Sequence, residues 1–474
     1  MSNIQDQVRQ DAASLHTFVS SISDKCVRRN GAVSYPEPSE RFFSYISELA
    51  AKTKSYLQAE IEIPNKAPED CLDLRRDIAI LQASWGFMHQ FVKPVLDADT
   101  LKLPTAFLQG LIARFQEIPI FSSTDFIFYH SSLLNYFNVK LGVFKPRADQ
   151  ISRIVDGPKF PEKLGLIGIP YSQSSSLFIN CLIPHEMGHY VFGELSLRKR
   201  FCKSIEGMLI SCLDVSFPGG RRTELIECIA NWVEELFCDL FAVRLMGFSF
   251  SLAFVELFNS ATALDDQSRY KESKEALEFD PNYPPDLFRL RKQVAVLKSD
   301  GWWEELQKTN SHYVRTLEVA EKLDDTDFNF GVLTPSDKSY DPAKVVETFL
   351  GILPNIIEKL NEVTAGDAEK PGIQNGAGLW KSSGKLIEEY LKNGVVPSSL
   401  IPDSGAEPVF PSPVALINAS YRYYVDVESL PKLLSSIENT NCNSIGDLSY
   451  WAKRVEMWTA KAIEDVILLA KERH

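Results

Sequence analysis

The sequence has too few basic residues, and its apolar runs are too short, for several common classes of protein. Its 50 lysines and arginines are outnumbered by 63 aspartates and glutamates, which gives a formal charge of −13. Nucleic acids and anionic membranes attract a surplus of positive charge, so this balance argues against both as partners. The longest uncharged apolar run near the middle of the chain, residues 174–184, is well short of the roughly 20 residues that cross a bilayer.

Export signals and cysteine pairs are also missing. The N-terminus has neither the basic start nor the apolar core of a signal peptide. The eight cysteines form no Cys-x-x-Cys pair, and in a long chain without an export signal we expect them to be reduced thiols. The sequence therefore predicts a cytoplasmic protein. Five of the cysteines lie between Cys181 and Cys238, which indicates that this stretch belongs to a core.

The sequence does have the composition of a folded protein and helical periodicity over most of its length. Apolar residues make up 45% and charged residues 24%, as in ordinary globular domains. Apolar residues recur at helical spacing in the first 140 residues, for example over 39–61 and 73–97, and again after residue 250. The short apolar segment 163–172, bounded by prolines, predicts a strand, whereas 126–137 fits a strand or a helix.

These patterns predict an α+β fold that is predominantly helical, with one small sheet near the middle of the chain. We expect three parts: an N-terminal helical unit over 1–140, a core over 141–260, and a mostly helical C-terminal region over 261–474. The core should hold two strong helices, around 184–196 and 223–247. Pro184 fits the first turn of the earlier helix, but would kink that helix if it began near Leu177.

One motif carries most of the chemical information: His185-Glu186-Met187-Gly188-His189. Residues four apart on a helix share a face, so His185 and His189 can offer imidazole nitrogens to one ion. Glu186 can then reach a metal-bound water without being a ligand itself. The other interpretation is a pair of helical histidines satisfied by core hydrogen bonds. The flanking residues are apolar, and polar groups buried among them need partners, which a metal would supply for the histidines.

Catalytic zinc usually takes three protein ligands and leaves a fourth position to water, so a third ligand is needed. Four polar residues of the predicted helix 223–247 recur at four-residue steps: Glu227, Asn231, Glu235 and Asp239. Glu235 follows His189 by 46 residues, enough for a loop and an antiparallel helix. Asp239, one turn further on, can accept the far N–H of a ligating histidine and fix its tautomer.

Other interpretations of this helix stay open. Glu234 is the main rival to Glu235 as a ligand, because it is the adjacent carboxylate. Glu194 and Glu227 are weaker rivals, since Glu194 lies close to His189 on the same helix and Glu227 has no aspartate one turn later. The acidic stripe as a whole is also compatible with an ordinary solvated helix face.

The pattern Glu-Leu-Phe-Cys-Asp over 235–239, together with HEMGH, resembles the gluzincin metallopeptidases, in which E-x-x-x-D supplies the third ligand and a supporting aspartate. The resemblance covers about 185–240, with 163–172 as a candidate active-site edge strand. Phe192 and Leu195 depart from the metzincin continuation. The resemblance implies a zincin-like catalytic core that binds one Zn²⁺ through His185, His189 and Glu235.

In such a core Asp239 would support a ligand, and Glu186 would act as the general base that activates water against a peptide bond of a peptide or protein substrate. Relatives also place a His, Tyr or Arg downstream to stabilise the oxyanion. Our candidate here is Tyr423. The alternatives are Tyr421, Arg422, Tyr424, His312 and Tyr313, each of which also fits a structural role. Arg289 and Arg291 are candidates to buttress the site, and a plain helix start explains them as well.

A second functional interpretation belongs to a different class. The zinc would be structural or vestigial, and the large helical flanks would bind a protein partner.

Overall fold

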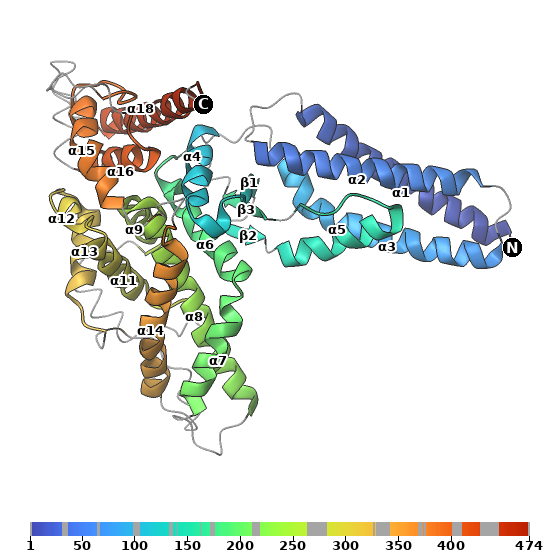
Figure 1. Cartoon of the computed structure of the whole chain (residues 1–474), viewed down its shortest axis with the longest axis horizontal. Helices are drawn as coiled ribbons and strands as arrows, with labels where there is room; N and C mark the ends of the chain where they lie inside the picture. The colour runs from blue at the N-terminus through green and yellow to red at the C-terminus, as the bar shows by residue number, and fades with distance from the viewer. Residues whose placement is uncertain are drawn as a thin grey trace. The chain divides into compact units, whose positions relative to one another are not determined.

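Helices dominate this computed structural model, and one small sheet accompanies them (Figure 1). The structure describes residues 2–30, 37–63, 67–97, 105–131, 136–139, 141–161, 163–170, 176–210, 219–262, 282–325, 328, 342–367, 373, 376–400, 410–426 and 445–472. The prediction of a predominantly helical fold with a small sheet is confirmed. Among the described residues, no helix has the length and apolar character needed to cross a membrane.

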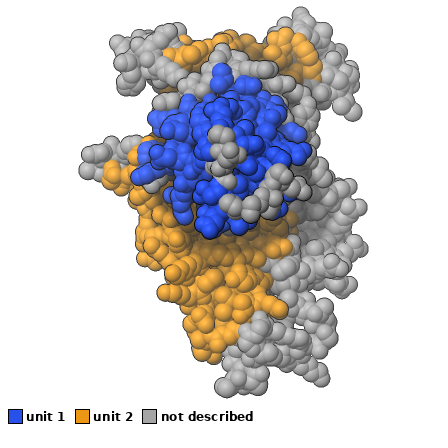
Figure 2. All heavy atoms as spheres, turned by 90° about the vertical axis from the view of Figure 1, so that its right-hand side faces the viewer, with its two compact units in different colours: residues 1–105, 123–174 blue, residues 106–122, 175–474 orange. Residues whose placement is uncertain are grey.

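The chain divides into two compact units, which Figure 2 shows in different colours. Unit 1 comprises Met1–Thr105 and Ser123–Ser174, and unit 2 comprises Ala106–Ser122 and Ser175–His474. This division differs from the three parts expected from the sequence. Residues 141–174 group with the N-terminal helices, and the chain from 261 onwards groups with the helices that carry the HEMGH motif and Glu235.

Unit 1 is a bundle of long helices with the sheet. Its elements are α1 (Ser2–Asn30), α2 (Glu37–Glu62), α3 (Pro68–Asp97), α5 (Leu141–Val155), β1 (Asp125–Ser131), β2 (Phe137–Val139) and β3 (Leu164–Pro170). Figure 1 shows the four helices running alongside one another, and their contacts pair α1 with α2 and α3, and α5 with α2 and α3. Large apolar side chains from the helices, including Phe42, Trp85 and Phe144, form one core with Ile127 and Leu166 of the sheet.

The sheet corrects one expectation from the sequence. The predicted strand 163–172 is β3, and it lies between β1 and β2, so it is the central strand of the described sheet rather than an edge strand. β3 pairs parallel to β1 and antiparallel to β2. All seven of its residues are buried, which explains the continuous apolar run. The ambiguous segment 126–137 contributes strands, since β1 covers its first half and β2 begins at its end.

Unit 2 is built around α8 (Gly219–Met246). The remaining helices are α4 (Thr105–Gln116), η1 (Pro119–Phe121), η3 (Ile179–Leu182), α6 (Ile183–Glu194), α7 (Leu197–Ile210), α9 (Phe248–Thr262), α11 (Asp286–Ser299), α12 (Trp303–Leu306), α13 (His312–Lys322), α14 (Pro342–Thr364), α15 (Gly376–Lys392), α16 (Pro413–Val425) and α18 (Ile445–Glu472). Helices α6, α7, α9, α11 and α14 all pack on α8. This explains why α8 is apolar on nearly all sides and why its polar residues need specific partners.

A tight turn at Gly247 separates α8 from α9. Gly247 adopts a left-handed φ of +66°, a conformation that glycine accepts without a Cβ penalty. The buried Asn418 of α16 then satisfies both helix ends. Its Nδ2 donates to the Met246 carbonyl at 2.7 Å, and its Oδ1 accepts from the Ser249 N–H at 2.9 Å. Because of this turn, residues early in α9 lie beside the motif helix.

The motif helix α6 begins at Ile183, so Pro184 lies in its first turn and does not kink it. α6 crosses α8 at a point where glycine is required. A Cβ at position 188 would lie only 2.8 Å from the Cα of Cys238 and 3.0 Å from its Cβ. Gly188 therefore allows the two backbones to approach closely, and this contact fixes which face of α8 the two histidines meet.

The Gly188 contact yields a first prediction. Gly188→Ala should lower the free energy of unfolding of the metal-free protein by about 1–3 kcal/mol, because the new methyl group must push α6 and α8 apart. Gly193→Ala is the matched control, since it lies on the same helix and its Cβ would meet nothing within 4 Å. The control should be neutral or slightly stabilising. Urea denaturation of both variants measures the difference, and equal effects would refute the close-contact interpretation.

Candidate metal centre

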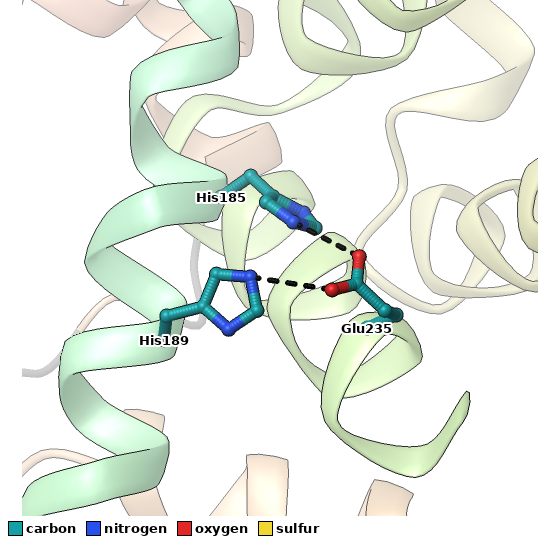
Figure 3. Close-up of side chains that lie close together, drawn as sticks. All are labelled: His185, His189 and Glu235. Atoms are coloured by element: carbon teal, nitrogen blue, oxygen red, sulfur yellow. Dashed lines mark ion pairs between the residues drawn. The ribbon is translucent and has the colours of Figure 1, made fainter. Parts of the chain in front are cut away.

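The two motif histidines project from α6 toward Glu235 on α8, as Figure 3 shows. His185 Nε2 lies 3.3 Å from Glu235 Oε2, and His189 Nε2 lies 3.5 Å from Glu235 Oε1. Among the described residues, these three side chains form a group whose potential ligand atoms all lie within 4.8 Å of one another. The structure thus brings together the three ligands predicted from the sequence.

The hydrogen bonds of the imidazole rings fix their tautomers. His185 Nδ1 lies 2.9 Å from Asp239 Oδ1, and His189 Nδ1 lies 3.0 Å from Glu234 Oε1. Because an ionised carboxylate only accepts hydrogen bonds, both rings must carry a proton on Nδ1. In the neutral ring the lone pair is then on Nε2, the nitrogen that faces Glu235. When neutral, each histidine is thus in the tautomer that binds a metal through Nε2.

The three side chains are close enough to share one ion. The nitrogen–oxygen distances are 3.3 Å from His185 Nε2 to Oε2 and 3.5 Å from His189 Nε2 to Oε1, one to each oxygen of the Glu235 carboxylate. One ligand atom from each residue lies within 4.8 Å of the others. The side chains of His185, His189 and Glu235 are 14%, 17% and 13% exposed. Two imidazoles and one carboxylate are ligand types that zinc uses in three-ligand sites.

The His185 side of the centre rests on a buried ion pair. Arg289 of α11 donates from Nε to Asp239 Oδ2 at 2.6 Å and from Nη2 to Asp239 Oδ1 at 2.9 Å. Its Nη2 also donates to Glu235 Oε2 at 3.4 Å. Burial raises the pKa of Asp239, but Arg289 and His185 outweigh this and lower it to about 2. Asp239 is therefore ionised and accepts from His185, as its supporting role requires.

The charges around His185 act on that ring in turn. Burial lowers the pKa of His185, but its hydrogen bonds to Asp239 and Glu235 and the charges of these carboxylates raise it to about 10. The same attraction lowers the pKa of Glu235 against the effect of its burial. Without a metal, the protein thus holds a proton at the point where the ligand atoms meet. A divalent metal ion would replace this proton on binding.

The hydrogen bonds of Glu234 favour Glu235 over Glu234 as the third ligand. Both oxygens of Glu234 accept hydrogen bonds, Oε1 from His189 and Oε2 from Arg198 Nη1 at 2.9 Å. Glu234 supports a histidine and does not face the point where the Nε2 atoms converge. Sequence reasoning did not anticipate this role, nor that of Arg198, which lies on α7.

Two further residues stand next to the centre. Glu186 is buried on α6 beside His185, and it is among the carboxylates that raise the pKa of the buried Cys238 thiol. The ring of Phe250, early in α9, stacks parallel to that of His185 with 6.4 Å between ring centroids. Phe250 limits the movement of His185 and gives one side of the centre an apolar wall.

The structure does not bring Tyr423 to this group. Tyr423 is buried on α16, and burial together with the carboxylates of Asp426 and Glu388 raises its pKa. Glu388 belongs to α15, so the groups that act on Tyr423 lie away from the histidines in the fold. Its role as oxyanion donor stays a prediction.

The alternative donors have other environments. Tyr421 donates its hydroxyl to Glu256, and its ring stacks on Phe178 at 4.5 Å between centroids. Tyr424 lies 5.0 Å from the same ring. Arg422 pairs with Glu388 of α15, whereas the rings of His312 and Tyr313 lie 4.0 Å apart, tilted to each other, at the start of α13. Tyr421 and Tyr424 thus contact Phe178, which precedes η3 and α6.

No family model, curated protein or solved structure matches this chain. The geometry of the centre is therefore the basis on which a function can be proposed.

The buried Arg289–Asp239 pair yields a second prediction. Arg289→Met should lower the free energy of unfolding of the metal-free protein by about 3–5 kcal/mol, because Asp239 loses its main counter-charge in a buried site. Adding Asp239→Asn should recover part of this loss by removing the unpaired charge. Chemical denaturation of the single and double variants tests both statements.

Arg291→Met serves as the control. Arg291 Nε pairs with Asp325 at 3.0 Å, and both side chains are partly exposed, so its loss should cost about 1 kcal/mol or less. Similar losses for Arg289→Met and Arg291→Met would contradict the central role of the buried pair.

Proposed function

We propose that this protein is a cytoplasmic zinc-dependent peptidase of the gluzincin type, with a zincin-like active site formed by α6 and α8. One observation carries the proposal. Carboxylates lie against the Nδ1 atoms of both motif histidines, and both Nε2 atoms lie beside Glu235, with one ligand atom of each of the three residues within 4.8 Å of the others. The two nitrogens and one oxygen suit zinc better than Mg²⁺ or Ca²⁺, which prefer oxygen ligands.

The roles of the chain's own residues follow from their places. His185, His189 and Glu235 would hold one Zn²⁺, which when bound acidifies a water and polarises a carbonyl. Glu186, adjacent to His185 on α6, would take the proton of the attacking water and pass it to the leaving amine. Asp239 and Glu234 keep both rings in the ligating tautomer.

The number of ligands favours catalysis over a structural role. Structural zinc sites are usually closed by four protein ligands, whereas the described residues here bring three together. A structural site has no need of Glu186, yet this carboxylate is buried directly beside a ligand. The alternative of a structural or vestigial zinc, with the helical flanks binding a protein partner, accounts for neither feature.

Substitution of Glu186 gives the decisive prediction. Glu186→Gln should retain stoichiometric zinc but lower peptide hydrolysis by about 10²–10⁴-fold, because only the proton acceptor is removed. His185→Ala and Glu235→Ala should lose the metal. Glu194→Gln, an exposed position at the end of the same helix, is the control and should leave both zinc content and hydrolysis unchanged. Elemental analysis and cleavage of a fluorogenic peptide mixture measure the two quantities.

Two outcomes would reject the proposal. If Glu186→Gln has no effect on the protein while His185→Ala unfolds it, the zinc is structural. If the purified protein is folded, contains no metal and cannot be loaded with zinc, the centre does not bind this ion at all.

A further inference from the structure

The two ligating histidines are anchored in different ways. On the His185 side, Asp239 is fully buried and its partner Arg289 is only 7% exposed. On the His189 side, Glu234 is 8% exposed but its partner Arg198 is 35% exposed. Each histidine thus has its own carboxylate and its own arginine, but only the second arginine reaches solvent.

Arg198 joins α7 to the polar face of α8. It donates from Nη1 to Glu234 Oε2 at 2.9 Å and from Nη2 to Asn231 Oδ1 at 2.7 Å, and its Nη2 also pairs with Glu227. Glu227 is 54% exposed, so the outer end of this network lies at the surface. The three acceptors lie on successive turns of α8, and a planar guanidinium can reach all of them from one position.

This arrangement makes the orientation of His189 depend on a helix that supplies no ligand. If Arg198 leaves, Glu234 loses the donor that holds its second oxygen, and Glu234 and Glu227 lose the cation that they share. The hydrogen bond between His189 Nδ1 and Glu234 is then held less firmly. Asp239 differs because its arginine, Arg289, is buried. Salt screens the partly exposed network far more than the buried pair.

We propose that Arg198 is a positioning residue that sets the zinc affinity of the centre by holding Glu234 against His189, so that metal retention responds to ionic strength and to the docking of α7. This inference rests on the proposed zinc site. It adds that the His189 side is the adjustable half of the centre.

The test measures zinc affinity by competition with a chromophoric chelator. Arg198→Gln should weaken zinc binding about 10–100-fold, the usual effect of losing an outer partner of a ligand. Arg198→Lys should lose less, because an ammonium keeps the charge but does not reach all three acceptors. The d–d absorption of the Co²⁺-substituted protein should change in Arg198→Gln, which a purely structural role would not require.

The chain supplies a matched control in Arg222. Its Nη2 pairs with Glu206 of α7 at 3.1 Å, so it also ties α8 to α7, at similar exposure and without touching a carboxylate of the centre. Arg222→Gln should leave zinc affinity and the Co²⁺ spectrum unchanged. Equal losses in Arg198→Gln and Arg222→Gln would show that general packing of α7 is responsible, and would overturn the proposal.

A salt titration of the wild type and of Arg198→Gln completes the test. Raising sodium nitrate from 50 to 500 mM, on the order of a threefold change in Debye length, should weaken zinc binding to the wild type more than to Arg198→Gln. Equal salt dependence, or wild-type affinity in Arg198→Gln, would overturn the proposal while leaving the zinc site intact. Absence of zinc binding by the wild type would instead refute the proposed function.

Discussion

The ion pair between Arg289 and Asp239 is the interaction on which the rest of the centre depends. It joins α11 to α8 inside the protein, at 2.6 and 2.9 Å, where an isolated charge on either residue would be costly. With Arg289 in place, Asp239 remains ionised and can hold the Nδ1–H of His185. The same guanidinium reaches Glu235, so one cation organises a supporting carboxylate and a ligating carboxylate together. A bound metal would join a charge arrangement that is already present.

Much of the centre could be predicted from the sequence because its spacing is set within single helices. Residues four apart share a helix face, which is why His185 with His189, and Glu235 with Asp239, could be assigned from local patterns. The choice between Glu234 and Glu235 could not, because adjacent residues point about 100° apart and the rotation of α8 decides which one faces the metal. That rotation depends on the contact between Gly188 and Cys238, which brings together helices far apart in the sequence.

The partners of the supporting carboxylates could be predicted only in part: Arg289 was a candidate together with Arg291, and Arg198 was not a candidate. Arg198 lies 36 residues before Glu234, and Arg289 lies 50 residues after Asp239. An arginine on an amphipathic helix has no local signal that distinguishes a surface position from a buried one. The boundaries of the two units also could not be predicted from the helical periodicity. Periodicity indicates that a segment is helical, but it does not indicate which helices the segment packs against. The α4 segment illustrates this, since it follows the helices of unit 1 in the chain but packs Phe115 against Tyr190 and Phe241 of unit 2.

The turn between α8 and α9 has a consequence for the order in which the protein can be completed. Its helix ends are satisfied by Asn418, a side chain 169 residues beyond Ser249. A ribosome makes the chain from the N-terminus at about 5–20 residues per second, so α8 and α9 exist for roughly ten seconds or more before Asn418 is synthesised. Until then the turn must be satisfied by water, and Phe250 has no fixed place beside His185. The C-terminal helix α16 therefore completes the turn beside the candidate centre, although it holds none of the three proposed ligands.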